Sequence, residues 1–340
     1  MKILPRLIGT MQSIFGIGTV KLKDNSGTLQ VRNAADDAFV KIQVATPTTD
    51  NDATPLIYVM DKAPLDIAGG RLGLYSGNPL AEGTAAETLY YIPCRSDRIS
   101  LYDGTTWTSY SFSQLELAIP STTNTLYDIF IYNNAGTLTL KAVAWTSSGA
   151  GSSTRAPSVD TTKINGVTVN SAATGERYLG TIKTTSVSGQ CADNLTNRFV
   201  NNYYNRIERN LLKNPSGTWS YSTNTTRIIK GDATQIIEWV SISPFDLVDL
   251  RLFMAISLAD GVSAYNYLAL NSQSTAIAVA AANQLDNQSG GTMFFNTTLN
   301  HTVQPFWGYN YACGLENVSA GTAEFFSYGV NCGIAAKLMM

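Results

Sequence analysis

Short stretches in which hydrophobic and polar residues alternate recur along the chain, separated by Gly, Asn and Asp. Alternation with a period of two predicts half-buried β-strands, because successive side chains of a strand point to opposite faces. Asp103–Gly104 lies between two such runs, and Asn133–Gly136 and Asn165–Gly166 occupy similar places. Asp-Gly and Asn-Gly favour tight hairpin turns, whose central residues need positive φ. We therefore expect hairpins at these three positions.

The first 68 residues differ from the rest. A hairpin is predicted around Asp24–Gly27, a strand begins at Phe39–Val44, and a connector rich in Thr, Asp and Pro follows. Because so short a segment has little core of its own, we expect it to gain stability from other chains or from a particle surface. The candidate anchoring residues are apolar and stand between glycines: Ile14, Phe15, Ile17 and Val20.

We expect four parts: an anchoring segment 1–68, a β-rich module 69–150, a second β module or connector 151–215, and a C-terminal domain 216–340. Within 194–213 the apolar spacing also fits a helix, but the aromatic residues and the β context favour a strand. Many short strands with little helix predict a jelly-roll-like β-sandwich for the last part. Its predicted strands include TWSYS, QIIEWVSIS, VDLRLFMAISL, YNYLALN, AIAVAA, TVQPFWGYNYACGLEN, AEFFSYG and CGIAAKLM.

Composition supports an all-β protein. Hydrophobic residues make up 44% of the 340 residues, but only 14% are charged. Solvated helical faces normally carry many Lys and Glu residues, so this balance argues against a helical protein.

The formal net charge is -2 and no segment is strongly basic, so nucleic acid is not an expected partner. No run approaches the roughly 20 apolar residues of a membrane helix. Pro5, Arg6 and Gln12 interrupt the apolar N-terminus, so we expect no signal peptide and synthesis in the cytoplasm without export.

The cysteines and the histidine do not suggest a metal or cofactor site. Cys94, Cys191, Cys313 and Cys332 are far apart in sequence, and His301 is the single histidine. We expect buried, reduced thiols, while a bridge between Cys313 and Cys332 across a hairpin stays open. His301 is predicted to be a polar residue of an Asn/Thr turn.

Two pairs of carboxylates are candidates for glycan cleavage: Asp246 with Asp249, and Glu82 with Glu87. Glu82 and Glu87 lie in a Gly/Ala/Thr-rich loop, and Asp246 and Asp249 flank a predicted turn. The chain has no nucleophile motif of the Gly-x-Ser-x-Gly type and no regular solenoid repeat. We therefore predict that the protein is not an enzyme.

Aromatic residues of the last part are candidates for contact with a receptor or glycan, because exposed rings stack on sugar faces and anchor protein contacts. At strand positions the same rings would fill the core. The candidate contact residues are Tyr265, Tyr267, Trp307, Tyr309 and Tyr311.

Several stretches, in order along most of the chain, resemble those of tail-fibre and virion structural proteins of tailed bacteriophages. They are VKLKDNSGTLQVRNAADDAFVKIQVATPTTDNDATPLIYV, RLGLYSGNPL, LYYIPCRSDRISLYDGTTWTSYSF, LYDIFIYNNAGTLTLKAVAWT, RYLGTIKTTSVSGQ, RFVNNYYNRIER, NYACGLENVSAGTAEFF and CGIAAKLMM. The resemblance implies a fibre or surface component of the virion, a homotrimer, and no catalytic residues. The chain lacks an extended repetitive or coiled-coil shaft, which favours a short appendage of the head or tail.

The implied partners are copies of the same chain, other virion proteins of the capsid, neck or tail, and a glycan or protein of the host surface. Three alternatives stay open beside a purely structural appendage: an adhesin, a capsid decoration or cement protein, and a glycan-cleaving tailspike.

Overall fold

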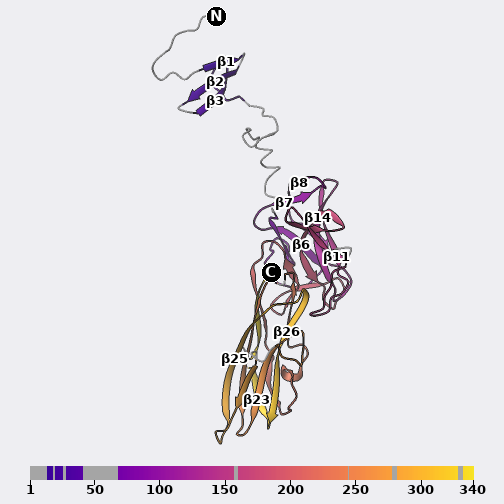
Figure 1. The fold of residues 1–340 in the computed structure, drawn as a ribbon, viewed down its shortest axis with the longest axis vertical. Coiled ribbons are helices and arrows are strands. Elements are labelled where there is room, and N and C mark those ends of the chain that lie inside the picture. Colours follow the sequence, from indigo (N-terminus) through magenta and orange to yellow (C-terminus); the bar gives the residue numbers. More distant parts are fainter. Residues whose placement is uncertain are drawn as a thin grey trace. The chain divides into compact units, whose positions relative to one another are not determined.

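The computed structural model describes residues 14–17, 20–25, 28–40, 68–156, 160–243, 245–277, 282–327 and 332–340. In these ranges the regular structure consists of β-strands and one 3₁₀ turn, η2 (Ile229–Gly231). The prediction of an all-β protein is confirmed. The chain divides into two compact units, Met1–Lys62 and Ala63–Met340 (Figure 1).

The first unit holds a three-stranded antiparallel sheet of β1 (Ile14–Ile17), β2 (Val20–Asn25) and β3 (Thr28–Asn33). The predicted hairpin is confirmed, because Asn25 of β2 pairs with Thr28 of β3. Phe39 forms a bridge with Arg32, whose guanidinium carbon lies 4.4 Å from the centre of the Phe39 ring. A strand was predicted at 39–44, and its residues 41–44 lie outside the described part of the chain.

The second unit begins with two small sheets and a larger one. One small sheet contains β4 (Gly70–Gly73), β6 (Thr88–Pro93) and β9 (Leu115–Ala118), and the other pairs β7 (Arg98–Tyr102) with β8 (Trp107–Ser111). The larger sheet, called sheet I here, has six strands. They are β10 (Leu126–Asn134), β11 (Thr137–Ala144), β12 (Thr161–Ile164), β13 (Val167–Asn170), β14 (Ala173–Lys183) and β17 (Val200–Asn202).

A hydrophobic core lies among these sheets. Leu89, Ile99, Ile129 and Ile182 are all fully buried there, and Tyr91 stacks on Phe112 with ring centres 4.9 Å apart. Full burial of such a side chain contributes about 1.5–3 kcal/mol. The core also includes Val240 and Ile242 from the C-terminal part. The N-terminal and C-terminal parts of the second unit therefore share this core.

Two further, mostly antiparallel sheets contain the strands of the C-terminal part. Sheet II has eight strands: β5 (Gly83–Ala86), β15 (Cys191–Asp193), β16 (Asn197–Arg198), β20 (Arg227–Ile228), β21 (Ile236–Ser241), β23 (Ser263–Leu270), β24 (Ala282–Asp286) and β26 (Gly308–Ala320). Within it, β16 and β21 are parallel. Sheet III has six: β18 (Glu208–Lys213), β19 (Gly217–Tyr221), β22 (Val248–Leu258), β25 (Met293–Val303), β27 (Ala323–Ser327) and β28 (Gly333–Met339).

The two sheets share one core and form the predicted sandwich. Buried residues alternate with exposed ones along β22, so Leu250, Leu252 and Met254 face inward and meet Trp239 of β21 and Leu268 of β23. The chain passes between the sheets repeatedly, from β21 to β22, from β22 to β23 and from β25 to β26. This connectivity gives the sandwich its jelly-roll-like character.

Sheet II combines strands from three of the predicted modules. It takes β5 from 69–150, β15 and β16 from 151–215, and its remaining strands from 216–340. Side chains reinforce this connection: Asn202 Oδ1 accepts a hydrogen bond from the Leu72 amide at 2.6 Å, and Asn201 Nδ2 donates to the Val240 carbonyl at 2.7 Å. The predicted modules thus share one compact unit.

All three hairpins predicted in this region are present, but one turn differs. Ala135–Gly136 and Asn165–Gly166 have positive φ (49° and 98°, 50° and 86°), as tight turns require. The prediction of a two-residue turn at Asp103–Gly104 was wrong. Tyr102 pairs with Trp107, so the hairpin closes through a loop of residues 103–106. The Asp103 carboxylate stabilises this loop by accepting hydrogen bonds from the Thr105 and Thr106 amides, at 2.8 and 2.7 Å.

Segment 194–213 contains the strands β16, β17 and β18, which agrees with the strand interpretation. The single strand predicted at 302–317 is wrong, because β25 ends at Val303 and β26 starts at Gly308. The sequence interpretation also missed most of β25, and it placed His301 in a turn where the structure has a strand. Of the predicted strand at 276–281, residues 278–281 lie outside the described part and Ala276–Ile277 are not in a strand.

Candidate functional site

The predicted aromatic contact residues occupy three different places. Tyr265 and Tyr267 stack on β23 with ring centres 6.3 Å apart, and Tyr309 and Tyr311 lie on β26 at 6.4 Å from each other. The register puts both pairs on the outer face of sheet II, where Ala269, Cys313 and Leu315 separate them. Trp307 lies in the loop before β26. The structure therefore does not unite the five residues in one site.

Tyr309 is half-buried and held by its neighbours. Its hydroxyl donates to Glu238 Oε1 at 2.6 Å, and the Lys183 ammonium lies 4.2 Å from its ring centre. Burial raises the pKa of the Tyr309 hydroxyl, and the Glu238 carboxylate adds to the shift. Tyr309 also lies edge-on to Phe199. These contacts connect sheet II to residues 183–199.

The loop before β26 exposes large aromatic side chains. Trp307 is 41% exposed, Phe306 is 53% exposed, and Phe245 in another loop is 89% exposed. Phe245 and Trp307 line the same pocket of about 330 Å³, together with Thr161, Thr168 and Tyr203. Trp307 also lines a second pocket of about 500 Å³. The Trp307 ring is therefore accessible from two concave surfaces.

Asn310 fixes this loop from inside the sandwich. Its fully buried side chain donates from Nδ2 to the carbonyl oxygens of Phe306 and Gly308, at 2.7 and 3.1 Å. Its Oδ1 accepts from the Phe306 amide and from Asn271 Nδ2, both at 3.1 Å. Gly308 has a φ of 78°, and a Cβ there would collide with Ser153. The loop therefore holds its exposed rings in one defined conformation.

Arg155 supports Trp307 from behind. Its guanidinium carbon lies 5.0 Å from the ring centres of both Trp145 and Trp307. Arg155 Nε forms an ion pair with Asp128 Oδ2 at 2.7 Å, and Asp128 is fully buried. Trp145 Nε1 and Thr181 Oγ1 also donate to Asp128 Oδ1, at 2.9 and 2.6 Å. This network of one ion pair and two hydrogen bonds keeps Arg155 in place beside the tryptophan.

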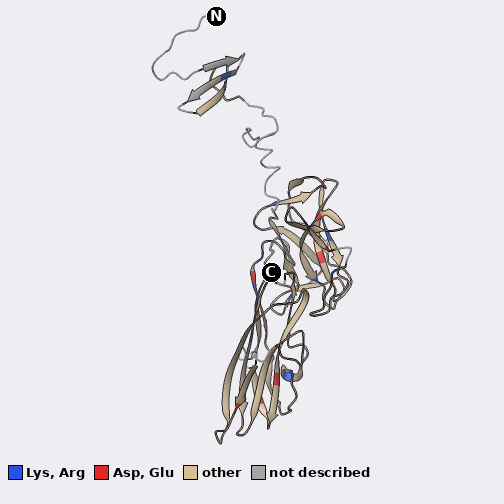
Figure 2. Cartoon of the chain, viewed as in Figure 1, with Lys and Arg blue, Asp and Glu red and all other residues tan. Residues whose placement is uncertain are grey.

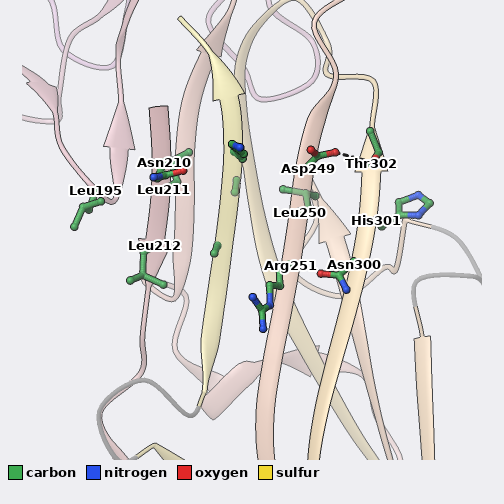
Figure 3. A pocket seen from close by; sticks show the side chains of 13 residues that line it. Leu195, Asn210, Leu211, Leu212, Asp249, Leu250, Arg251, Asn300, His301 and Thr302 are labelled. Atoms are coloured by element: carbon green, nitrogen blue, oxygen red, sulfur yellow. Dashed lines mark hydrogen bonds between the residues drawn. The ribbon is translucent and has the colours of Figure 1, made fainter. Parts of the chain in front are cut away.

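A larger concave surface lies on the outer face of sheet III. It has a volume of about 770 Å³ and is called the sheet III groove here (Figure 3). The strand register arranges its polar side chains in two rows. One row contains Asn210, Lys337, Asp249 and Thr302, and the other contains Leu212, Ala335, Arg251 and Asn300. Asp249 Oδ1 accepts a hydrogen bond from Thr302 Oγ1 at 2.7 Å (Figure 3).

The sequence interpretation named Asp249 and His301 in this region but found no groove. His301 pairs with Leu250, whose side chain points into the core, so the imidazole lies on the opposite face from Arg251 and Asn300. The residues of the two rows come from four strands, β18, β22, β25 and β28, that are far apart in the chain. Only the register of sheet III brings them together.

The four candidate catalytic carboxylates lie in different surroundings. Asp246 forms an ion pair with Arg206 at 2.6 Å, and Glu82 with Arg198 at 2.7 Å. Asp249 is bonded to Thr302, and Glu87 is exposed between β5 and β6. Charged residues are sparse over the described part of the ribbon (Figure 2).

Ile14, Phe15 and Ile17 lie on β1, and Val20 begins β2. Their side chains lie outside the described part, so their anchoring role stays a prediction.

All four cysteines are unpaired. Cys191, Cys313 and Cys332 are buried as expected, but Cys94 is exposed, because it follows β6 in a turn at the surface. Burial raises the pKa of the Cys313 and Cys332 thiols to about 12.

In the described ranges, no group of three or more His, Cys, Asp or Glu residues is placed to hold a metal ion. The same ranges contain no helix with the length and apolarity to span a membrane.

No known protein family and no curated protein matches the sequence. Among solved structures, dimeric latent PorU from Porphyromonas gingivalis is similar with 11% identity and a TM-score of 0.25, over 79% of this chain and 21% of PorU. BuGH86 in complex with neoagarooctaose has 10% identity and a TM-score of 0.23, over 76% of this chain and 32% of the other. The structure of the infectious bursal disease virus Gx strain has 9% identity and a TM-score of 0.24, over 84% and 80% of the two chains. This chain thus spans about a fifth of PorU and a third of BuGH86.

Proposed function

We propose that this protein is a non-catalytic structural component of a bacteriophage virion, a short fibre or appendage protein of the head or tail. In this proposal residues 1–68 dock to the particle, and the C-terminal sandwich is presented to the host surface for attachment. The sequence resemblance to phage fibre and virion proteins is the source of the virion assignment. The all-β architecture, with short strands and tight turns, agrees with it.

The observation that carries the attachment role is the rigidly displayed Trp307 loop. Exposed aromatic rings stack on sugars or anchor protein contacts, and they bind best when no ordering is needed on binding. Here Asn310 fixes the backbone of the loop and Arg155 supports the Trp307 ring. A protein with only a scaffolding role has no need to hold Phe306 and Trp307 at its surface in this way.

A homotrimer is part of the proposal. Within the described residues β25 pairs with β22 only, so its other edge carries unpaired backbone groups. Its eleven residues include no Lys, Arg, Asp or Glu, whereas soluble proteins usually protect such edges with charge. Assembly with other copies would cover this edge. Light scattering of the purified chain tests the oligomeric state, and a monomer at micromolar concentration would contradict this part.

The alternatives are a capsid decoration or cement protein and a glycan-cleaving tailspike. A decoration protein needs no attachment surface, so the Trp307 loop favours the appendage. A tailspike needs two carboxylates free to act on the same glycosidic bond. The ion pairs of Asp246 and Glu82 with arginines favour a structural role for these groups.

The attachment role is tested with purified protein and host cells. Trp307→Ala is expected to reduce binding to cells by about tenfold or more, because an aromatic anchor commonly contributes 2 kcal/mol or more. Tyr75→Ala is the control, since Tyr75 is 61% exposed but lies outside the Trp307 pockets. Equal binding of the two variants and the unchanged protein would contradict the attachment role of this loop.

A further inference from the structure

Among the described residues, the sheet III groove contains a cation without a carboxylate partner. Lys337 Nζ is paired with Glu208 at 2.7 Å, and Asp249 is bonded to Thr302. Among the residues that the structure describes, no carboxylate lies within ion-pairing distance of Arg251. Its guanidinium carbon lies 5.8 Å from the ring centre of Phe253, its neighbour on the same face. Arg251 is exposed, so its five donors are available to a ligand.

The neighbours of Arg251 leave room for that ligand. Ala335 faces Arg251 from β28. Its side chain is only a methyl group, which makes the groove deeper on that side. Asn300 faces it from β25 and supplies an amide that can donate or accept. Leu212 follows Ala335 in the same row, and the exposed Leu195 lies at the side of the groove. One end of the row therefore offers an apolar surface and the other offers hydrogen bonds.

The second row is one step along the strands. Residues two positions apart on one face are separated by roughly 7 Å, about the span of one sugar ring. In this row Asp249 and Thr302 offer acceptors and a hydroxyl, and Asn210 lies beyond Lys337. Such groups recognise the hydroxyls of a saccharide.

We propose that the sheet III groove binds a carboxylate-bearing saccharide, such as a uronic or sialic acid unit of a surface glycan. The carboxylate lies against Arg251 and Asn300, and ring hydroxyls bind Asp249 and Thr302. The guanidinium fork matches a planar carboxylate with two parallel hydrogen bonds. The inference rests on the proposed attachment function and names its ligand class.

The charge of Asp249 affects which acidic group of a ligand can bind beside Arg251. Its carboxylate is two residues from Arg251 on the same face, so it repels a doubly charged phosphate more than a singly charged carboxylate. A sulfate ester is singly charged as well, and two of its oxygens can accept hydrogen bonds from the fork of Arg251. Sulfated glycans are therefore the comparison that tests the choice of a planar carboxylate.

The test uses the full chain on an array in which each uronate- or sialate-containing glycan is printed beside its carboxyl-reduced counterpart, with sulfated and phosphorylated glycans included. We expect binding to at least one carboxylated glycan, and binding about tenfold to a hundredfold weaker to its reduced form, because hydrogen bonds to charged groups contribute about 1.5–3 kcal/mol. Arg251→Ala should reduce the binding to the level of the reduced glycan. Arg251→Lys should give an intermediate value, because the charge remains but the fork is lost.

Arg95→Ala is the matched control, since Arg95 is also exposed but lies outside the groove. Unfolding curves of both alanine variants should match that of the unchanged protein. A preference for sulfated, phosphorylated or neutral glycans would overturn the inference, as would binding that Arg251→Ala leaves unchanged, or no glycan binding at all. If these results occur while Trp307→Ala still reduces cell binding, the attachment function stands and only the ligand class is wrong.

Discussion

Replacement of Asn310 by Ala tests whether the exposed Trp307 loop is held in place by the sandwich core. The change removes four hydrogen bonds, three of them to the backbone of Phe306 and Gly308. A hydrogen bond contributes about 1 kcal/mol net on average, and a buried partner left unsatisfied costs about 1–3 kcal/mol. Since Asn310 is fully buried, we expect the free energy of unfolding to fall by about 3–5 kcal/mol.

Two measurements follow this change. Urea unfolding, monitored by tryptophan fluorescence, gives the loss of stability, and hydrogen exchange of residues 304–310 reports the local loosening of the loop. Asn300→Ala is the control: the same side chain is removed from an exposed strand position, where a change within about 0.5 kcal/mol is expected. If Asn310→Ala and Asn300→Ala gave the same stability and the same exchange rates, the loop would not depend on Asn310. The argument for a preorganised binding loop would then be refuted.

Two further predictions concern the buried polar groups. Asp128→Asn should lower the free energy of unfolding by about 3–5 kcal/mol, because it leaves the largely buried Arg155 without its ionic partner. Thermal or urea unfolding measures this loss of stability. A loss below about 1 kcal/mol would contradict the prediction. In the folded protein a thiol reagent should label Cys94 quickly and the other three cysteines slowly, because burial raises the pKa of the Cys191, Cys313 and Cys332 thiols and blocks access. Mass spectrometry locates the labels, and rapid modification of Cys191 would show that the core of the second unit opens readily.

Much of the strand pattern could be predicted from the sequence. Segments such as Val248–Leu258 alternate buried and exposed residues along their length, and the Asn-Gly pair at 165–166 has the positive φ that it suggests. β25 was missed because Thr297 and His301 stand between Phe295, Leu299 and Val303 at the inward-facing positions, so the alternation of hydrophobic and polar residues is weak. The break between β25 and β26 had a signal in Pro305 and Gly308, which the surrounding aromatic residues concealed.

The candidate sites could be predicted only in part. Trp307 was named from the sequence because it is aromatic, but its exposure depends on Asn310 and on Arg155, which is distant in the chain. Arg251 gave no signal, because a single arginine in a strand is ordinary. Its importance comes from Ala335 and Asn300, which the sheet register places on either side of it. Local patterns specify strands, whereas the pairing of distant strands builds the sites.

The most direct test of the proposed function is cryo-electron microscopy of intact phage particles, combined with mass spectrometry of their proteins. We predict that the chain is present in purified particles, with residues 1–68 against other virion proteins and the sheet III groove and Trp307 loop open to solvent. Absence of the chain from purified particles, or a position in which both surfaces are covered by virion proteins, would contradict the proposal.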